Sequence, residues 1–193
     1  MKEEKLLLIL DIDETLIHAT SNKLDKEEDF SVFNYYVYQR PYLHEFIDEI
    51  RNDYHLAIWS SASDDYVREI VNCIIPKEIN LQFVWGRSRC KPKRILDIDS
   101  YGIYDNRYQE QYNYIKPLKK VKKLGFKLER TLIVDDTPHK CIENYGNAIY
   151  PKEYLGQNDD DELLFLAKYL KTLKDEKNVR KIEKRDWKKK IQK

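Results

Sequence analysis

Two aspartates stand one residue apart immediately after a run of apolar residues near the start of the chain. The apolar run is Leu6–Leu10, and the residues that follow it read DIDET, so the pair is Asp11 and Asp13. A strand of this composition is expected to be buried, and packing alone gives no reason to place charge at its end. Paired carboxylates do have a chemical use, because one can attack phosphorus while the other protonates the departing oxygen.

The spacing of the pair suits a two-step transfer of a phosphoryl group. Side chains on a strand repeat every two residues, so Asp11 and Asp13 line one side of the strand end or of the loop that leaves it. Attack by a carboxylate gives an aspartyl-phosphate, which water later hydrolyses. We expect Asp13 to act first as the general acid and then as the general base. Bound Mg²⁺ would screen the repulsion between a carboxylate and a phosphate dianion.

Other polar residues follow other apolar runs in the same way. Ser60 and Ser61 follow one run, Asp135 and Asp136 follow another, and Lys116 begins a segment with helical spacing. In a doubly wound sheet the ligand site lies outside the carboxyl ends of the strands, so we expect these residues to converge there. Carboxylate oxygens suit Mg²⁺, whereas a hydroxyl and an ammonium suit a phosphate.

Each of these groups taken alone has a plainer interpretation. A lone D-x-D-x-T motif is more often a capped turn than a nucleophile, and a lysine among many charges is usually a solvated surface residue. Thr137 and Pro138 fit the N-cap and first positions of a helix. Convergence of all the groups at one edge of a sheet is what favours the functional interpretation.

Uniformly apolar segments of strand length alternate with amphipathic segments along the chain. The apolar segments cover residues 5–10, 55–60, 130–136 and 147–151. The amphipathic segments cover residues 40–53, 63–75 and 116–126, and their apolar residues follow helical spacing. Strand followed by helix, repeated, predicts an α/β fold with a Rossmann-like doubly wound parallel sheet.

Two insertions and a C-terminal extension interrupt this alternation. Residues 19–39 hold a polar loop and then the alternating FNYYVYQ, which predicts a hairpin. Residues 77–114 are rich in Tyr and Arg and predict a small β insert or cap. The 193 residues, 41% of them hydrophobic, suit one catalytic domain over 1–175 that carries this insert. A basic helical tail is expected over 176–193.

Charge is distributed unevenly although the formal net charge is only +1. Residues 168–193 carry a net charge of +8 and the remainder carries −7. A basic segment of this kind is usually the solvated face of a helix, but this one could instead bind an acidic partner or a nucleic acid. Three tyrosines of the insert either pack within it or line a peptide or nucleotide groove. They are Tyr101, Tyr104 and Tyr108.

Several other enzyme classes are excluded by what the sequence lacks. A cysteine phosphatase needs an arginine six residues after its cysteine, and none of the three cysteines has one. The residues found at those positions are Ile79, Leu96 and Asn147. The five glycines form no phosphate-binding or dinucleotide-binding loop, and the four histidines have no metal-ligand spacing.

The cysteine pattern and the start of the chain bear on its compartment. The cysteines are odd in number and include no C-x-x-C pair, which favours a reducing compartment. The first apolar run is too short for a signal sequence or a membrane span. We expect an intracellular protein, in the cytoplasm or the nucleus, without membrane contact.

The chain has D-x-D-x-T after its first apolar run, Ser60 after the second, then Lys116, and the pair Asp135 and Asp136 after the third. This order of four motifs resembles that of the haloacid dehalogenase (HAD) superfamily of phosphohydrolases. Within it, the chain resembles the small phosphatases that act on the C-terminal domain (CTD) of RNA polymerase II, including those with a ubiquitin-like domain. The segments that carry the resemblance are DIDETLIHAT, YYVYQRPYLHEFIDEI, LAIWSSAS, YIKPL and LIVDDTP. No ubiquitin-like domain is expected before Leu6, and the insert resembles the family mainly at RSRC.

The resemblance implies a role for each motif residue. Asp11 corresponds to the nucleophile, Asp13 to the acid and base, and Lys116 to the lysine that holds phosphate and nucleophile. The expected catalytic residues are Asp11, Asp13 and Lys116. The expected metal ligands are Asp11, Asp13 (through its carbonyl), Asp135 and Asp136. The expected phosphate-binding residues are Thr15, Ser60, Ser61 and Lys116.

The expected function is that of a magnesium-dependent phosphomonoester hydrolase, with phosphoserine or phosphothreonine in a protein as substrate. Two alternatives stay open. One is a phosphatase of the same fold that acts on a nucleic-acid end or a small metabolite, and the other is a non-catalytic phosphoprotein-binding module. Without metal, the tip of the first strand is expected to be electrostatically strained, so that Asp11→Asn would stabilise the protein.

Overall fold

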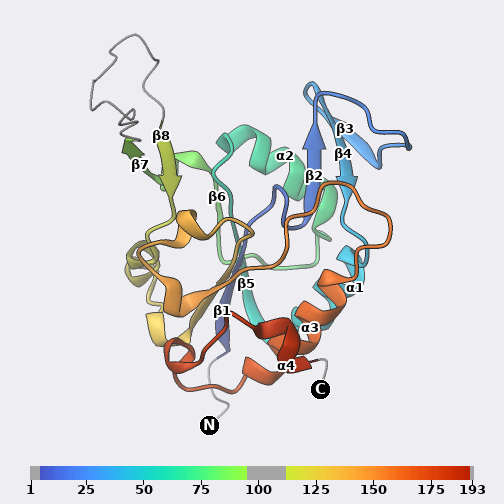
Figure 1. The fold of residues 1–193 in the computed structure, drawn as a ribbon. Helices are drawn as coiled ribbons and strands as arrows, with labels where there is room; N and C mark the ends of the chain where they lie inside the picture. The colour runs from blue at the N-terminus through green and yellow to red at the C-terminus, as the bar shows by residue number, and fades with distance from the viewer. Residues whose placement is uncertain (1–4, 95–111, 192–193) are drawn as a thin grey trace, which may run out of the picture.

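The computed structural model describes residues 5–94 and 112–191, apart from the side chains of Arg94 and Tyr112. Its centre is a five-stranded sheet in the order β10-β9-β1-β5-β6, in which every neighbouring pair is parallel (Figure 1). The strands are β1 (Leu6–Leu10), β5 (Tyr54–Trp59), β6 (Val84–Trp85), β9 (Thr131–Val134) and β10 (Ala148–Ile149). The predicted α/β fold with a parallel sheet is confirmed.

The two faces of the sheet bury separate cores because side chains alternate along each strand. Leu8 of β1 packs in the larger core, whereas Ile9 packs in the smaller core on the opposite face. The longer helices of the larger core are α1 (Leu43–Ile50), α2 (Asp64–Ile74) and α3 (Glu162–Leu173). The smaller core is covered by 3₁₀ turns, chiefly η2 (Leu118–Leu124) and η4 (Pro138–Cys141). Side chains on both faces of β1 are therefore buried, which explains why the strand is a continuous run of apolar residues.

The helix predicted for residues 116–126 is a 3₁₀ helix instead, η2. Its sequence, LKKVKKL, crowds four lysines into one and a half turns, and like charges at this spacing disfavour a regular α-helix. Gly125 ends the helix with a φ of 89°, a conformation that suits glycine. The remaining 3₁₀ turns are η1 (Arg87–Arg89), η3 (Leu128–Arg130), η5 (Tyr145–Asn147) and η6 (Val179–Lys181).

Two small antiparallel sheets flank the edge of the molecule toward which β1 points (Figure 1). One has the order β2-β4-β3, and its strands are β2 (Ile17–Thr20), β3 (Phe30–Val32) and β4 (Tyr35–Gln39). The predicted hairpin is its β3-β4 pair, in which Phe33 of the turn has a φ of 53°. The other sheet pairs β7 (Lys91–Arg94) with β8 (Tyr112–Ile115).

The predicted insert, residues 77–114, contributes a strand to the central sheet. Its β6 pairs in parallel with β5 and completes the edge of that sheet. The part of the insert that stands away from the sheet therefore begins after β6, at η1 and β7. Tyr101, Tyr104 and Tyr108 lie outside the described residues, so their predicted roles stay predictions.

The basic C-terminal segment does not continue α3 as one helix. It folds back through η6 and a short helix, α4 (Trp187–Ile191), and it buries Val179 and Trp187 in the larger core. The Trp187 indole donates a hydrogen bond to the Tyr150 carbonyl at 3.0 Å. Val179 lies off the face of α3 that carries the buried Leu166, Leu170 and Leu173, so a continuous helix would leave it exposed.

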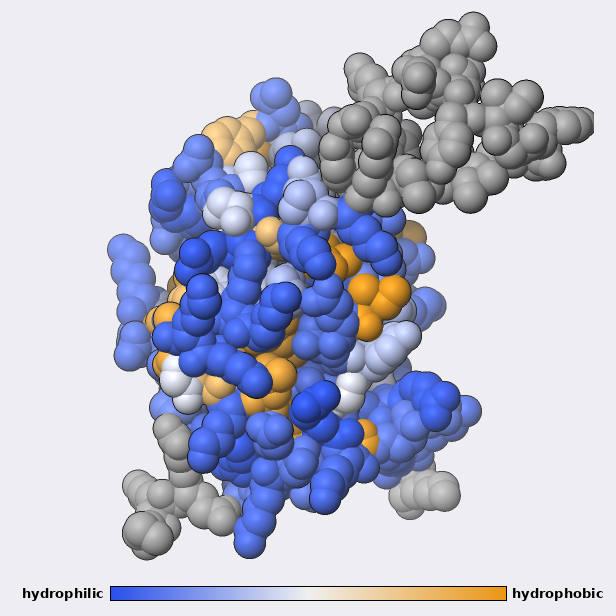
Figure 2. Space-filling model, turned by 90° about the vertical axis from the view of Figure 1, so that its left-hand side faces the viewer, coloured by the Kyte–Doolittle hydropathy of each residue, from blue (hydrophilic) through white to orange (hydrophobic). Residues whose placement is uncertain are grey.

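The face of the molecule drawn in Figure 2 is predominantly polar. On the face shown in Figure 2, hydrophilic residues surround small, separate apolar patches. None of the described helices combines the length and the apolar character that crossing a membrane requires.

Arg40 is a fully buried arginine that ties three loops together. Its guanidinium donates to both carboxylate oxygens of Asp160 at 2.8 Å, to the Thr15 carbonyl at 2.9 Å and to the Lys152 carbonyl at 2.8 Å. It also lies over the ring of Tyr154. Because the Thr15 loop leaves β1, this contact fixes the segment that follows the strand.

We expect Asp160→Asn to lower the free energy of unfolding by about 3 kcal/mol, because it leaves the buried Arg40 without its counter-charge. Urea unfolding followed by circular dichroism would measure the change. Asp159→Asn, at the exposed neighbouring position, is the control and should change stability little. Equal stability of the two variants would contradict a structural role for the Arg40 pair.

Candidate active site

Three polar residues that follow neighbouring strands lie side by side and are buried: Asp11 after β1, Ser60 after β5 and Asp135 after β9. Each continues the backbone hydrogen bonding of its sheet by one residue. The three amides donate to the carbonyls of Val134, Trp85 and Ile149, at 2.9, 2.9 and 3.2 Å respectively. The sheet itself therefore positions these side chains along one edge.

Lys116 joins two of these strands through a buried ion-pair network. Its ammonium lies 2.9 Å from Asp11 Oδ1 and 2.6 Å from Asp135 Oδ2, and its side chain is fully buried. Burial alone would lower the pKa of Lys116, but the charges of Asp11 and Asp135 outweigh it, so the pKa lies above its usual value. The lysine therefore stays charged where it can hold an anion.

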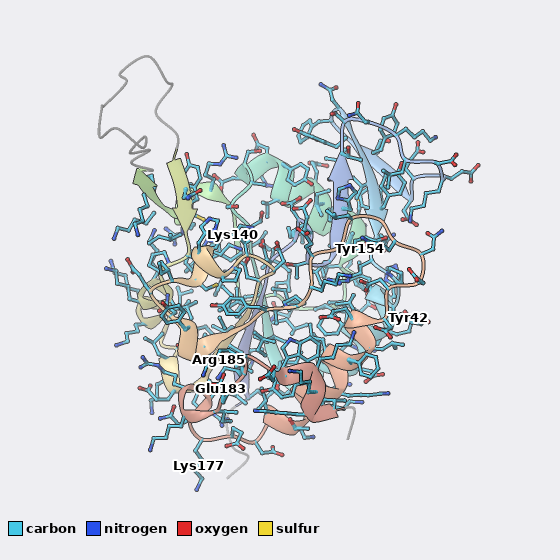
Figure 3. All side chains as sticks on the ribbon, viewed as in Figure 1. Tyr42, Lys140, Tyr154, Lys177, Glu183 and Arg185 are labelled. Carbon is cyan, nitrogen blue, oxygen red and sulfur yellow. The ribbon has the colours of Figure 1, made fainter. Side chains whose placement is uncertain are left out.

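Lys140, on η4, is a second lysine at this site and was not predicted from the sequence (Figure 3). Its ammonium lies 3.0 Å from Asp11 Oδ2, 3.8 Å from Asp135 Oδ1 and 4.0 Å from Asp136 Oδ1. The signal that could have revealed it is its position four residues after Asp136, in the turn that the acidic pair begins. One ammonium thus faces all three carboxylates.

Asp13 lies in different surroundings from Asp11. Its carboxylate accepts hydrogen bonds from the Tyr66 hydroxyl at 2.6 Å and from Ser60 Oγ at 3.1 Å. Burial raises the pKa of Asp13 despite these hydrogen bonds, and the charge of Asp11 adds to the increase. Tyr66 was also not predicted, because on α2 it follows the same spacing as the apolar core residues.

The pKa of Asp11 is shifted the opposite way. Burial opposes ionisation of its carboxyl, but Lys116 and Lys140 outweigh that effect and lower the pKa below its usual value. Asp11 is therefore held as a carboxylate, while Asp13 retains a proton more readily. Two carboxyl groups whose surroundings separate their pKa values suit the roles of nucleophile and general acid.

The electrostatic strain predicted for the tip of β1 falls on Asp13, Glu14 and the neighbouring Asp135 rather than on Asp11. Glu14 has a left-handed backbone conformation, with a φ of 58°. Burial raises the pKa of Glu14 to about 7, and the charges of Asp13 and Asp136 add to the increase. Burial and the charge of Asp11 likewise raise the pKa of Asp135 to about 7. The expectation that Asp11→Asn stabilises the protein assumed that the Asp11 carboxylate is unpaired without metal. That assumption is wrong, because Asp11 pairs with Lys116 and Lys140, and the change would remove their counter-charge.

The predicted hydroxyl residues differ in what their side chains contact. Thr15 Oγ1 exchanges hydrogen bonds of 3.2 Å with the carboxylate and the amide of Asp136, so it holds the β9 loop in place. Ser60 Oγ also accepts from the Ala62 amide at 3.0 Å, which fixes its direction. Ser61 is partly exposed, and its carbonyl accepts a hydrogen bond from Arg87 at 2.9 Å.

Three of the four predicted metal ligands bring their carboxylates together. Oxygen atoms of Asp11, Asp135 and Asp136 all lie within 4.8 Å of one another. Such a set of hard oxygen donors fits a divalent cation such as Mg²⁺. The carboxylate of Asp13 is outside this group because it faces Tyr66 and Ser60.

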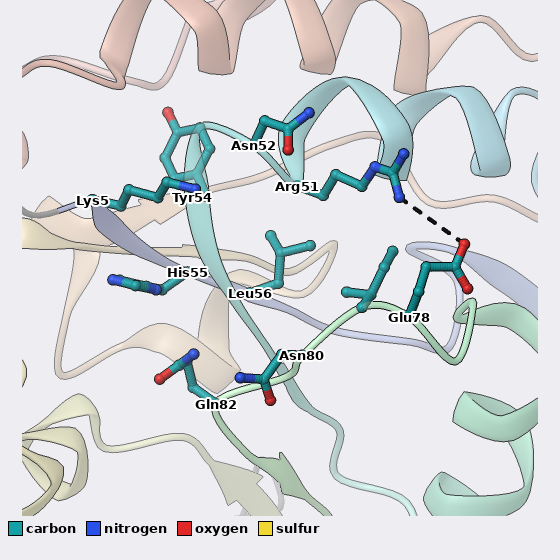
Figure 4. Close-up of a pocket in the computed structure, with 10 residues that line it drawn as sticks. Lys5, Arg51, Asn52, Tyr54, His55, Leu56, Glu78, Asn80 and Gln82 are labelled. Atoms are coloured by element: carbon teal, nitrogen blue, oxygen red, sulfur yellow. Dashed lines mark ion pairs between the residues drawn. The ribbon is translucent and has the colours of Figure 1, made fainter.

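A cleft of about 360 Å³ opens beside Asp13 and Glu14. Its other walls include Phe33, Tyr35, Tyr66 and Arg87, which come from the β3-β4 turn, β4, α2 and η1. A second pocket, of about 320 Å³, lies around the beginning of β5, and its Arg51 and Glu78 form an ion pair at 4.0 Å (Figure 4). That pocket is at the opposite end of β5 from Ser60, so it is separate from the carboxylates.

A sequence model of the family described as NLI interacting factor-like phosphatase matches residues 6–180. The CTD small phosphatase-like protein 2 of Dictyostelium discoideum is 27% identical over 183 residues, which cover 91% of this chain and 29% of that protein. The ubiquitin-like domain-containing CTD phosphatase 1 of Xenopus tropicalis is 25% identical over 198 residues, covering 96% and 55%. The chain thus spans only about a third to about half of these relatives.

A solved structure titled as that of Fcp1, an essential RNA polymerase II CTD phosphatase, has a similar fold. The TM-score is 0.63 at 18% identity, and the match covers 88% of this chain and 62% of that one. At this identity the similarity concerns the fold alone. The predicted HAD-type fold and the predicted family resemblance are both confirmed.

We expect Lys140→Met to lower the free energy of unfolding in EDTA by about 3 kcal/mol, because three clustered carboxylates lose a partly buried counter-charge. The same variant should bind Mg²⁺ more tightly, since metal and ammonium compete for the same oxygens. Urea unfolding and titration calorimetry would measure the two effects. Lys119→Met, on the exposed side of η2, is the control, and unchanged Mg²⁺ affinity in Lys140→Met would refute the competition.

The raised pKa of Glu14 predicts how stability depends on pH. The folded protein keeps this proton up to about pH 7, whereas an ordinary glutamate loses it near 4.5, so the group destabilises the fold as pH rises between these values. In EDTA, we expect Glu14→Gln to be more stable than the parent by a larger margin at pH 8 than at pH 5. Urea unfolding at both pH values tests this, with exposed Glu27→Gln as the control. A gain that is the same at both pH values would show that ionisation of Glu14 is not the cause.

Proposed function

The chain belongs to the NLI interacting factor-like phosphatase family, and on that premise we propose that it removes phosphate from phosphoserine or phosphothreonine in proteins through an aspartyl-phosphate. The observation that carries this proposal is the contrast between Asp11 and Asp13. They are one residue apart, yet one has a lowered pKa and the other a raised pKa. That division is what a nucleophile and a general acid require.

Asp11 acts as the nucleophile in this proposal. An Asp11 carboxylate oxygen attacks phosphorus, the bond from phosphorus to the serine or threonine oxygen breaks, and the phosphoryl group becomes bonded to Asp11. Lys116 donates to Oδ1 of the same carboxylate and so fixes its orientation. Its ammonium would balance charge on the phosphoryl oxygens.

Asp13 supplies and then removes a proton. In the first step its carboxyl gives a proton to the departing serine or threonine oxygen, which leaves as the alcohol. In the second step the Asp13 carboxylate takes a proton from the water that attacks phosphorus, the bond from the Asp11 oxygen to phosphorus breaks, and inorganic phosphate leaves. Tyr66 and Ser60 hold both oxygens of Asp13, so its carboxyl stays in one orientation through both steps.

The carboxylate group of Asp11, Asp135 and Asp136 is the proposed site for Mg²⁺. A bound Mg²⁺ supplies Lewis-acid polarisation of the phosphate and offsets its charge near the nucleophile. Thr15 and Thr137 hold Asp136 at this site, the first through Oδ1 and the second through Oδ2 at 2.8 Å.

The cleft beside Asp13 supports a peptide substrate. Its walls combine exposed aromatic side chains, Phe33 and Tyr35, with the guanidinium of Arg87. Aromatic rings offer contact area to an extended chain, and an arginine suits an anionic group on it. The relatives whose names describe CTD phosphatases are consistent with a protein substrate.

We expect hydrolysis of p-nitrophenyl phosphate that requires Mg²⁺, stops in EDTA and falls about a thousandfold or more in Asp11→Asn. Rapid acid quenching of the parent should trap protein heavier by one phosphoryl group, and the Asp11→Asn protein should trap none. Exposed Asp25→Asn is the matched control. Full activity in Asp11→Asn would contradict the proposed role of Asp11 as the nucleophile.

Substrate class is tested by comparing turnover of a phosphoserine peptide, an oligonucleotide phosphorylated at its 3′ or 5′ end, and sugar phosphates. We expect the highest kcat/KM for the peptide. A preference for the oligonucleotide or the sugar phosphates would reassign the enzyme to the corresponding alternative. Binding of the phosphopeptide without turnover of any substrate would indicate a binding module.

A further inference from the structure

A pocket of about 640 Å³ lies between η5 and the segment that follows η6. It is larger than the cleft beside Asp13, which holds about 360 Å³. The residues of its lining that matter here are Tyr145, Tyr150, Arg180, Lys181, Lys184 and Arg185. None of these residues has a part in the proposed phosphatase reaction.

The lining of this pocket carries an excess of positive charge. It contains four basic residues and one acidic residue, Glu183. The carboxylate of Glu183 is already engaged, because Arg185 donates to both of its oxygens, at 3.0 and 2.6 Å (Figure 3). Arg180 Nη1 lies 4.0 Å from Glu129 Oε1, which is a long distance for an ion pair. Among the described residues, Lys181 and Lys184 of this lining have no carboxylate within ion-pair distance.

Lys184 is the strongest sign that an anion belongs in the pocket. It is only 5% exposed, and its ammonium donates to the Val179 carbonyl at 2.5 Å and to the Ile182 carbonyl at 2.7 Å. An ammonium has three N–H donors, so one is left over. Among the described residues no carboxylate lies within ion-pair distance of it, and burying a cation without a counter-charge is costly.

Aromatic side chains form another part of the pocket wall. Tyr145 is 66% exposed, and the buried hydroxyl of Tyr150 has no hydrogen-bond partner among the described residues. Gly146 lets η5 approach the backbone of Arg180 closely, since a Cβ at that position would lie 3.3 Å from the Arg180 carbonyl oxygen. The wall thus offers ring surface next to the cations.

We propose that this pocket is a second anion-binding site, separate from the carboxylate centre, and that it takes a phosphate group. Phosphate presents several acceptor oxygens that match the guanidinium of Arg180, the ammonium of Lys181 and the free N–H of Lys184. The adjoining tyrosines would contact the part of the ligand that bears the phosphate. This inference does not depend on the proposed enzymatic activity.

Phosphate binding is measured on the full chain by titration calorimetry and by thermal melting. EDTA is present, so that no metal links phosphate to the active-site carboxylates. The probes are inorganic phosphate, adenosine monophosphate and a phosphoserine peptide, each compared with NaCl at equal ionic strength. We expect the parent to bind and to melt at a higher temperature with phosphate than with NaCl. The probe that binds most tightly identifies the source of the phosphate group.

Lys181→Glu is the decisive variant, because Lys181 is exposed and its replacement should leave the fold intact. It should weaken binding of the preferred probe at least tenfold while hydrolysis of p-nitrophenyl phosphate is unchanged. Lys189→Glu makes the same charge reversal on α4, outside the pocket, and should bind within about twofold of the parent. Lys184→Met should also lose binding if it folds.

Two results would overturn the proposal. One is equal weakening in Lys181→Glu and Lys189→Glu, which would indicate attraction to the overall basic segment. The other is a parent that binds none of the three probes beyond the NaCl reference. Neither result bears on hydrolysis at Asp11, so failure of this site and failure of the proposed function are distinguishable.

Discussion

The placement of the Lys116 ammonium between Asp11 and Asp135 is the interaction on which the rest of the site depends. All three side chains are fully buried, and a buried charge is tolerated only when its partners are fixed at hydrogen-bonding distance. The parallel sheet meets this requirement, because β1 and β9 are neighbours in register and release their aspartates at the same edge. The sheet is thus the frame that holds opposite charges close together in a buried site.

The surroundings of each carboxyl group, more than its identity, determine what it can do. Asp11 faces two lysines and is held as an anion, whereas Asp13 faces neutral hydroxyl groups and keeps its proton more readily. Neighbouring positions acquire these opposite environments because the chain leaves β1 between them. The loop after Asp11 turns sharply, and Arg40 holds it through the Thr15 carbonyl. Structure far from the carboxyl groups therefore maintains the difference between them.

Much of the fold and part of the site could be predicted from the sequence, because their signals are local. Runs of apolar residues identified β1, β5, β9 and β10, and Asp11, Ser60 and Asp135 followed from their positions at strand ends. Lys140 and Tyr66 could not be found in this way. Each reaches the site from an element whose own spacing looks ordinary, and only the three-dimensional packing brings it there. The short β6 was predicted as part of the insert rather than of the central sheet, because only its pairing with β5 shows to which sheet it belongs.

The order of strands in the central sheet has a consequence for how the chain folds. β1 sits between β5 and β9, and Leu7 pairs with His55 on one side and with Thr131 on the other. The second pairing closes a long loop, and such pairings slow folding. Until β9 and Lys116 arrive, burying Asp11 would leave its charge unpaired, so the first strand should stay solvated at its tip. The ion pair therefore couples completion of the sheet to assembly of the site.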